Sequence, residues 1–255
     1  MTRLKIDALE NIVEHVDGVY GTLYFIDCFE AVKYMNGMHF DLALSDIPWG
    51  NNFKTPKKAH MGHVAMCKPR EQIEYNDAFN PEQNLKFLNL MKSLSDCQVL
   101  CTGEKNSFWW IRNSDPIGTI HIVLRNSYTA SKISQGNYYC PYFVYGKLPH
   151  KLKRNVIDID MSPKEMETLV FTITQEMGFL RKRTFDTPSA KDENLWSKIV
   201  LEMEAKSIFD CCAGSGTIGE TGELLQIPWI GFEIDKNCKN SALRRIKNKA
   251  SVKLW

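Results

Sequence analysis

The residues with the clearest chemical meaning form a glycine-rich turn in the last quarter of the chain. Gly214, Gly216 and Gly219 spell G-x-G-x-x-G between an apolar run that ends at Asp210 and a helix-like segment. Glycines at this spacing let the backbone approach a ligand closely and bring it to a helix N-terminus. Nineteen residues after Gly214, the next apolar run ends at Glu233, an acid placed to bind ribose hydroxyls. The pattern predicts a nucleotide-type site, for which a nicotinamide dinucleotide and S-adenosylmethionine are both open.

The position of this turn in the chain helps to decide between the two cofactors. A dinucleotide site normally opens its fold, with several strand–helix units still to follow. Only 22 residues follow Glu233, enough for one helix, so we expect strands from earlier in the sequence to complete the sheet. A nicotinamide-dependent oxidoreductase would need a second half-site after Glu233 and is disfavoured. A structural glycine turn with an accidental acid is the non-functional alternative.

A second group of reactive side chains, Asp46, Ile47, Pro48 and Trp49, follows the apolar run 40–45. Residues just past the carboxyl end of a strand in an open α/β sheet face the ligand crevice. A carboxylate, a proline-stiffened turn and a large aromatic at that place suit chemistry on a nucleic-acid base. An Asp-x-Pro turn beside a buried tryptophan is the structural alternative.

The exocyclic amino nitrogen of adenine or cytosine is a poor nucleophile, because its lone pair is delocalised into the ring. Acceptors for its two hydrogens favour the pyramidal, nucleophilic nitrogen and so stabilise the transition state. The Asp46 carboxylate and the Ile47 carbonyl are candidates for these acceptors, with Pro48 fixing the carbonyl. Trp49 is a candidate for stacking on a base that has swung out of its helix, as enzymes acting on bases require.

Together, these two groups resemble the motifs of the amino-group (adenine-N6 or cytosine-N4) DNA methyltransferases, in the permuted order that places the catalytic motif before the cofactor motif. Residues 46–49 are similar to the family's D-P-P-Y, with Ile47 and Trp49 in place of proline and tyrosine. Residues 210–219 are similar to its L-D-P-F-A-G-S-G-T-T-G segment, with Cys212 where the aromatic usually lies. The opening strand and helix (24–32), the late strand (142–147) and the segment entering the cofactor pocket (187–191) follow in the same order. In that last segment Thr187 and Asp192 replace the family's histidine and second proline.

The resemblance implies a Rossmann-like α/β fold in permuted order, with a mostly parallel seven-stranded sheet and one antiparallel edge hairpin. It also implies one methyltransferase domain over residues 1–255, with S-adenosyl-L-methionine as its cofactor. The residues that it assigns to the cofactor are Asp27, Lys191, Asp210, Cys211, Cys212, Ala213, Gly214, Gly216, Thr217 and Glu233.

The substrate implied by the resemblance is DNA, with a flipped adenine as the methyl acceptor, because the family's cytosine enzymes more often carry serine where Asp46 stands. Site-specific enzymes of this type occur in restriction-modification. Residues 51–80 are expected to form an inserted loop on the substrate side, and residues 150–185 a short target-recognition segment. Candidate nucleic-acid contacts are Lys54, Lys57, Lys58, Arg154, Arg181 and Arg183, whereas Arg244, Arg245, Lys247 and Lys249 are expected to form a solvated helix face.

Several alternatives stay open. Cytosine-N4 methylation of DNA and adenine methylation of RNA use the same chemistry. A glutamine-modifying protein methyltransferase shares the logic of the motif but typically begins it with asparagine rather than Asp46. Ile47 and Trp49 motivate a catalytically silent nucleic-acid-binding subunit. The sequence leaves open a homodimer, a paired restriction nuclease and the recognition site.

The elements that must position these residues alternate along the chain as apolar runs and helix-like patterns, which is typical of α/β layering. We expect strands over residues 21–26, 40–45, 98–102, 118–124, 142–145, 207–211 and 229–233. We expect helices over residues 29–35, 81–95, 163–177, 194–203, 218–225 and 236–249. Both groups of reactive side chains then follow the carboxyl end of a strand.

The composition fits a globular protein that needs no metal or disulfide scaffold. The chain has 255 residues, 44% of them hydrophobic, and a net charge of +2, so contacts with nucleic acid must come from local basic patches. No apolar run approaches the ~20 residues of a membrane span, and the first residues do not resemble a signal peptide. We therefore expect a cytoplasmic protein, no membrane partner and reduced cysteines. His60, His63 and Cys67 lack a fourth ligand at zinc-finger spacing, so no metal is expected.

Overall fold

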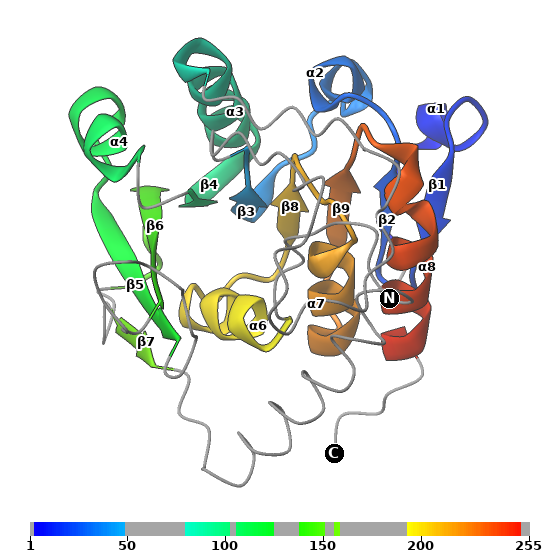
Figure 1. Ribbon diagram of the computed structural model, residues 1–255. Helices are drawn as coiled ribbons and strands as arrows, with labels where there is room; N and C mark the ends of the chain where they lie inside the picture. Colours follow the sequence, from blue (N-terminus) through cyan, green and yellow to red (C-terminus); the bar gives the residue numbers. More distant parts are fainter. Residues whose placement is uncertain are drawn as a thin grey trace, which may run out of the picture.

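The computed structural model describes residues 3–48, 80–102, 106–124, 138–150, 156–158 and 193–250, and in this part of the chain a mixed sheet forms the centre (Figure 1). The sheet has nine strands in the order β1-β2-β9-β8-β3-β4-β6-β5-β7. Their bounds are β1 His15–Asp17, β2 Gly21–Tyr24, β3 Phe40–Asp46, β4 Ser95–Cys101, β5 Gly118–Leu124, β6 Tyr138–Gly146, β7 Val156–Asp158, β8 Ile208–Asp210 and β9 Trp229–Phe232.

The middle of the sheet is a parallel block, in which β2, β9, β8, β3 and β4 run in the same direction. At one edge β1 pairs with β2 antiparallel, and at the other β6 lies antiparallel between β4 and β5. The predicted α/β fold with a mostly parallel sheet and an antiparallel hairpin is therefore confirmed. All seven expected strands are present, and β1 and β7 were missed because three residues are too short to show an alternating pattern.

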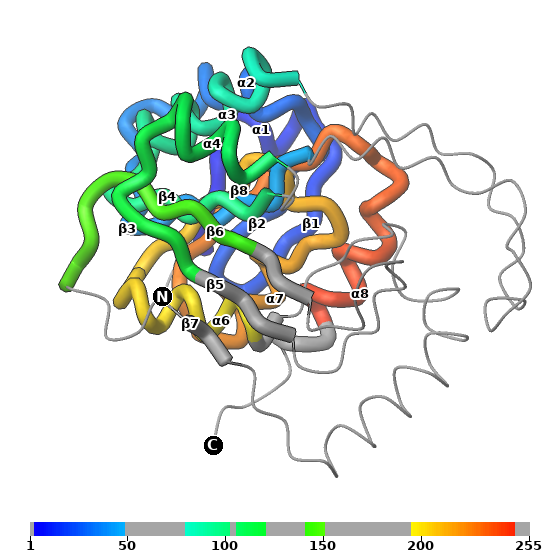
Figure 2. The backbone as a smooth tube through the Cα atoms, turned by 60° about the vertical axis from the view of Figure 1, so that its left-hand side comes forward, coloured from blue at the N-terminus to red at the C-terminus, as the bar shows by residue number. Residues whose placement is uncertain are grey.

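Helices cover both faces of the sheet. One layer holds α1 (Asp7–Glu10), α2 (Cys28–Ala31) continued by η1 (Val32–Tyr34), α3 (Pro81–Leu94) and α4 (Ser107–Ser114). The other layer holds α6 (Glu193–Glu202), α7 (Thr217–Leu225) and α8 (Lys239–Ala250), the last preceded by η3 (Lys236–Cys238). Figures 1 and 2 show the two layers on opposite sides of the strands. The helix expected over residues 163–177 lies outside the described residues.

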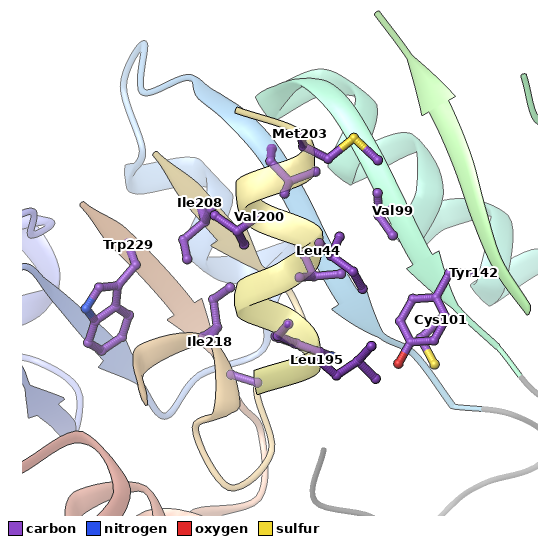
Figure 3. Packing of buried hydrophobic residues seen from close by; sticks show 14 of the residues in the cluster. Leu44, Val99, Cys101, Tyr142, Leu195, Val200, Met203, Ile208, Ile218 and Trp229 are labelled. Atoms are coloured by element: carbon purple, nitrogen blue, oxygen red, sulfur yellow. The ribbon is translucent and has the colours of Figure 1, made fainter. Parts of the chain in front are cut away.

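Successive side chains in the middle of β3 point to opposite faces of the sheet, so this strand packs against both helix layers. Leu42 and Leu44 belong to the cluster under α6 and α7, whereas Ala43 between them belongs to the cluster under α2 and α3. A strand buried on both faces is typical of a parallel sheet, which needs helices on each side. In Figure 3, Leu195 and Val200 of α6, with Met203 directly after the helix, pack against Leu44 and neighbouring strand residues. These side chains place β3 at the centre of the core.

The glycines of α7 allow this helix to lie close to its neighbours. A Cβ atom on Gly219 would lie 2.7 Å from Cγ1 of Ile246 on α8 and 2.8 Å from the Trp229 ring on β9. Such distances are far below van der Waals contact, so a larger residue would push α7 away from the sheet. The third glycine of the motif therefore serves helix–strand packing rather than ligand contact.

Two further observations concern the cysteine thiols and the length and apolar character of the helices. Cys28, Cys97, Cys101, Cys211, Cys212 and Cys238 carry free thiols. Of the helices described, none combines the length and the apolar character that crossing a membrane requires.

The packing around β3 predicts the effect of truncating its central leucine. Leu44 is fully buried, so Leu44→Ala should lower the free energy of unfolding by about 2–5 kcal/mol through lost burial and a cavity. Leu201→Ala is the matched control, because Leu201 on α6 is 62% exposed and its truncation should change stability by less than about 0.5 kcal/mol. Urea unfolding of both variants checks this. Equal losses of unfolding free energy in Leu44→Ala and Leu201→Ala would show that β3 is not at the centre of the core.

Candidate active site

The parallel block brings both groups of candidate residues to one edge of the sheet. Asp210 ends β8 and Asp46 ends β3, and these two strands are direct neighbours. The chain leaves β8 through α7 toward β9 on one side and leaves β3 through α3 toward β4 on the other. The strand order therefore diverges between β8 and β3. In open α/β sheets, ligands bind outside the carboxyl ends of the strands at such a switch point.

The turn after β8 is held in a conformation that needs glycine. Gly214 and Gly216 have φ angles of +52° and +86°, in the left-handed region that other residues rarely adopt. The amide of Ala213 donates to the Phe232 carbonyl at 2.8 Å, which ties the turn to β9, and the Gly216 amide donates back to Ala213. Gly216 then forms the N-cap of α7 without any side-chain cap. The first-turn amides of α7 are thus left for another acceptor.

Glu233, directly after β9, lies against this turn. Its Oε2 accepts from the Gly214 amide at 2.7 Å and its Oε1 from the Asp235 amide at 2.8 Å. Burial raises the pKa of Glu233 above its ordinary value, although both amide bonds oppose the shift. Each carboxylate oxygen keeps a second lone pair for a ligand hydroxyl. The neighbouring Ile234 is 70% exposed and offers an apolar surface beside these acceptors.

Asp210 and Ser45 connect the two halves of the site. Ser45 Oγ, on β3, donates to Asp210 Oδ1 at 2.6 Å, and the Cys212 amide donates to the same oxygen at 2.9 Å. The other oxygen, Oδ2, is buried without a hydrogen-bond partner in the described part of the chain. Burial is the main cause that raises the pKa of Asp210 well above its ordinary value, with the thiol of Cys211 adding to it.

The structure places the predicted catalytic residues as far as Pro48. Asp46 is partly exposed at the end of β3, opposite Cys101 of β4, and the side chain of Ile47 is buried in the core. Asp46 is also close enough to Asp210 for its charge to raise the pKa of Asp210. Pro48 is partly exposed, and Trp49 lies outside the described residues.

The other residues predicted to bind the cofactor divide into three groups. Asp27 is the N-cap of α2, where its Oδ1 accepts from the Phe29 amide at 2.7 Å, and it follows β2 at the same edge as the glycine turn. The Cys211 thiol lies between those of Cys28 and Cys212, close to Ser45 Oγ at 3.2 Å. Lys191, the third, lies outside the described residues, as do most of residues 51–80 and 150–185 and the residues predicted to contact nucleic acid, Lys54, Lys57, Lys58, Arg154, Arg181 and Arg183.

One sequence expectation is wrong, since Arg245 does not lie on a solvated helix face. Arg245 is 4% exposed and its guanidinium reaches Glu220 and the glycine turn. A signal was present in the sequence: Arg245 follows Ala242 by three residues and precedes Ile246, so it shares their apolar helix face. Ser45 was also passed over, because nothing local in the sequence indicates its bond to Asp210.

Comparisons with known proteins identify the fold. No protein-family model and no curated protein matches this sequence. Among solved structures, the complex of M1.HpyAVI with SAM aligns with a TM-score of 0.54 and 19% identity, over 88% of this chain and 98% of that chain. The PvuII DNA methyltransferase, described as cytosine-N4-specific, aligns with a TM-score of 0.55 and 15% identity, over 90% and 86%. The protein therefore has the α/β fold found in these structures.

The buried carboxyl of Asp210 predicts a pH dependence of stability. Because its pKa is higher in the folded than in the unfolded protein, its contribution is complete below the unfolded value of about 4 and is lost as pH rises through the folded value. Relative to Asp210→Asn, the wild type should lose about 1.4 kcal/mol per pH unit within that window. Urea unfolding of both proteins at successive pH values measures the difference. Parallel stability curves would contradict it.

Proposed function

We propose that this protein is an S-adenosylmethionine-dependent methyltransferase that acts on the exocyclic amino group of a base in DNA, with adenine as the acceptor. One observation carries the proposal. The glycine turn follows β8 and the Asp46 segment follows the neighbouring strand β3, and the hydrogen bond from Ser45 to Asp210 joins these two strands. The shared fold supports it, because one solved structure of this fold is a complex with SAM and another is described as a DNA methyltransferase.

The residues around the glycine turn fit the cofactor. The turn has no side-chain cap, so backbone amides at the start of α7 can meet a carboxylate such as that of a methionine group. Glu233 offers acceptors for the two ribose hydroxyls, and the exposed side chain of Ile234 offers a surface for an adenine ring. When bound, S-adenosylmethionine supplies an electrophilic methyl group. Asp27 and Lys191 are further proposed contacts on the rim of this site.

The Asp46 segment would hold the acceptor base. The Asp46 carboxylate accepts a hydrogen bond from the target amino group, and the Ile47 carbonyl accepts the second, so that electron density stays on the nitrogen. The buried Ile47 side chain and Pro48 hold that carbonyl in place. Trp49 stacks on the extruded base, an interaction worth about 1–3 kcal/mol. The leading aspartate, which the resemblance associates with adenine, is the reason to choose adenine.

The DNA backbone would be held by basic side chains rather than by the overall charge of +2. We assign this role to Lys54, Lys57 and Lys58 in the segment after Asp46, and to Arg154, Arg181 and Arg183 in the segment 150–185. Binding through such contacts weakens steeply as salt concentration rises.

Incubation with labelled S-adenosylmethionine and unmethylated DNA, followed by nucleoside analysis, tests the proposal. Label in N6-methyladenine is the expected result. Label in N4-methylcytosine would show that the acceptor base is cytosine, as described for the PvuII enzyme. Label found only in RNA or protein would show that DNA is not the substrate. Cofactor binding without transfer to any of the three would indicate a silent subunit.

Removing the Asp46 carboxylate should separate catalysis from cofactor binding. Asp46→Ala should slow methyl transfer by about 10²–10³-fold, because an acceptor used in the transition state is lost. Cofactor affinity should be unchanged, since none of the proposed cofactor contacts lies on β3 or in the segment that follows it. Asp41→Asn, at the exposed start of the same strand, is the control and should retain full activity.

Single-turnover methylation and calorimetric cofactor binding on both variants measure this. Full activity of Asp46→Ala would sink the mechanism. Loss of cofactor binding in that variant would mean that Asp46 has a structural role instead.

Neutralising Glu233 should weaken cofactor binding in a pH-dependent way. Glu233→Gln replaces one acceptor by an NH2 group that faces backbone donors, so affinity for S-adenosylmethionine should fall about tenfold or more. In the wild type, affinity should also fall as pH is lowered through the raised pKa of Glu233, since protonation removes an acceptor. The variant should lack this pH dependence. Calorimetry at several pH values measures the affinity for S-adenosylmethionine, with Glu30→Gln as the control because Glu30 is exposed. Identical pH profiles for the wild type and Glu233→Gln would show that Glu233 does not bind the ribose.

A further inference from the structure

Arg245 reaches from the last described helix to the glycine turn. Its Nε donates to Glu220 Oε2 at 2.5 Å, and its Nη1 donates to Ser215 Oγ and to Thr217 Oγ1, both at 2.9 Å. All four residues are less than one-tenth exposed, although only Arg245 and Glu220 carry charge. The arrangement joins α8, α7 and the turn between β8 and α7.

The choice of arginine follows from the geometry. A guanidinium presents five N–H donors in a rigid plane, so one side chain can serve a carboxylate and two hydroxyls in fixed directions. A lysine ammonium would serve them only as a point charge. Burying the charge is tolerated because Glu220, one turn into α7, is its counter-ion.

The two hydroxyls flank the position where the turn is most constrained. Gly216 lies between Ser215 and Thr217 with a φ of +86°, and a Cβ atom there would lie 3.1 Å from that of Ala242 on α8. Serine and threonine near a helix start normally compete for its free amides. Here Arg245 engages both hydroxyls, and no side chain caps α7. The amides are therefore kept for a ligand.

We propose that Arg245 is a positioning residue for cofactor binding, which holds Ser215 and Thr217 so that the turn keeps its ligand-binding shape, with Glu220 as its counter-ion. The inference rests on the proposed function for the identity of the ligand. Arg245 acts through the turn and does not itself contact the cofactor.

The test uses the double variant Arg245→Met with Glu220→Met, which removes both charges at similar volume, a change that buried ion pairs often tolerate. The first readout is hydrogen exchange without cofactor at the bonded amides of Ala213, Gly214 and Gly216. The second is the affinity for S-adenosylmethionine. We expect exchange about tenfold faster or more, and affinity about tenfold weaker or more, with kcat at saturating cofactor and KM for DNA within about twofold.

Two further variants keep the test decisive. Ser215→Ala removes one of the two acceptors but leaves the ion pair and Thr217, and it should change both readouts in the same direction even if the double methionine variant does not fold. Arg244→Met is the matched control on α8, where Arg244 bonds to Ser241 within its own helix at 3.4 Å, and it should leave both readouts unchanged.

The outcomes separate this inference from the proposed function. Folded variants with wild-type exchange and affinity would overturn the role of Arg245 and leave the methyltransferase proposal intact. If the variants exchange faster but the wild type binds no S-adenosylmethionine, the identity of the cofactor would be overturned. The role of Arg245 in positioning the turn would then still stand. A parallel fall in kcat and in DNA affinity would show general destabilisation and would also overturn the inference.

Discussion

The hydrogen bond from Ser45 to Asp210, 2.6 Å long and fully buried, joins the strand that carries Asp46 to the strand that carries the glycine turn. These strands are neighbours only because β8, late in the chain, enters the sheet beside β3, early in the chain. Their shared direction brings both carboxyl ends to one edge, where the sheet order diverges and a crevice can form. Without this pairing, the two groups of reactive residues would belong to separate surfaces.

Three polar side chains, two of them buried and one partly buried, hold the glycine turn through hydrogen bonds. Glu233 accepts from the Gly214 amide, Asp210 accepts from the Cys212 amide, and Arg245 holds the hydroxyls on either side of Gly216. Buried networks of this kind are favourable only when their members are satisfied, and they then specify a single conformation. Asp210 Oδ2 is the exception, because it is buried and has no hydrogen-bond partner among the described residues.

Much of the fold was predictable from local patterns. All seven strands expected from apolar runs are present, and the helix starting at Pro81 begins where Asn80 and the proline predict it, with the Asn80 side chain accepting from the Gln83 amide. The glycine turn and both acids at strand ends were predictable for the same reason, because their chemistry is written in consecutive residues. Strands β1 and β7 were not, since three residues are too short to show an alternating pattern, and helices α1 and α4 were not expected either.

The sequence by itself determined which residues can do chemistry and that each group ends a strand. Only the tertiary structure decided which strands are neighbours, that Ser45 bonds to a residue 165 positions away, and that Arg245 is buried beneath the turn rather than solvated. The physical reason is that hydrophobic periodicity reports which face of an element is buried, but not what lies opposite. A polar side chain on such a face is stable only if a partner from elsewhere in the chain meets it, and that partner is a property of the folded protein.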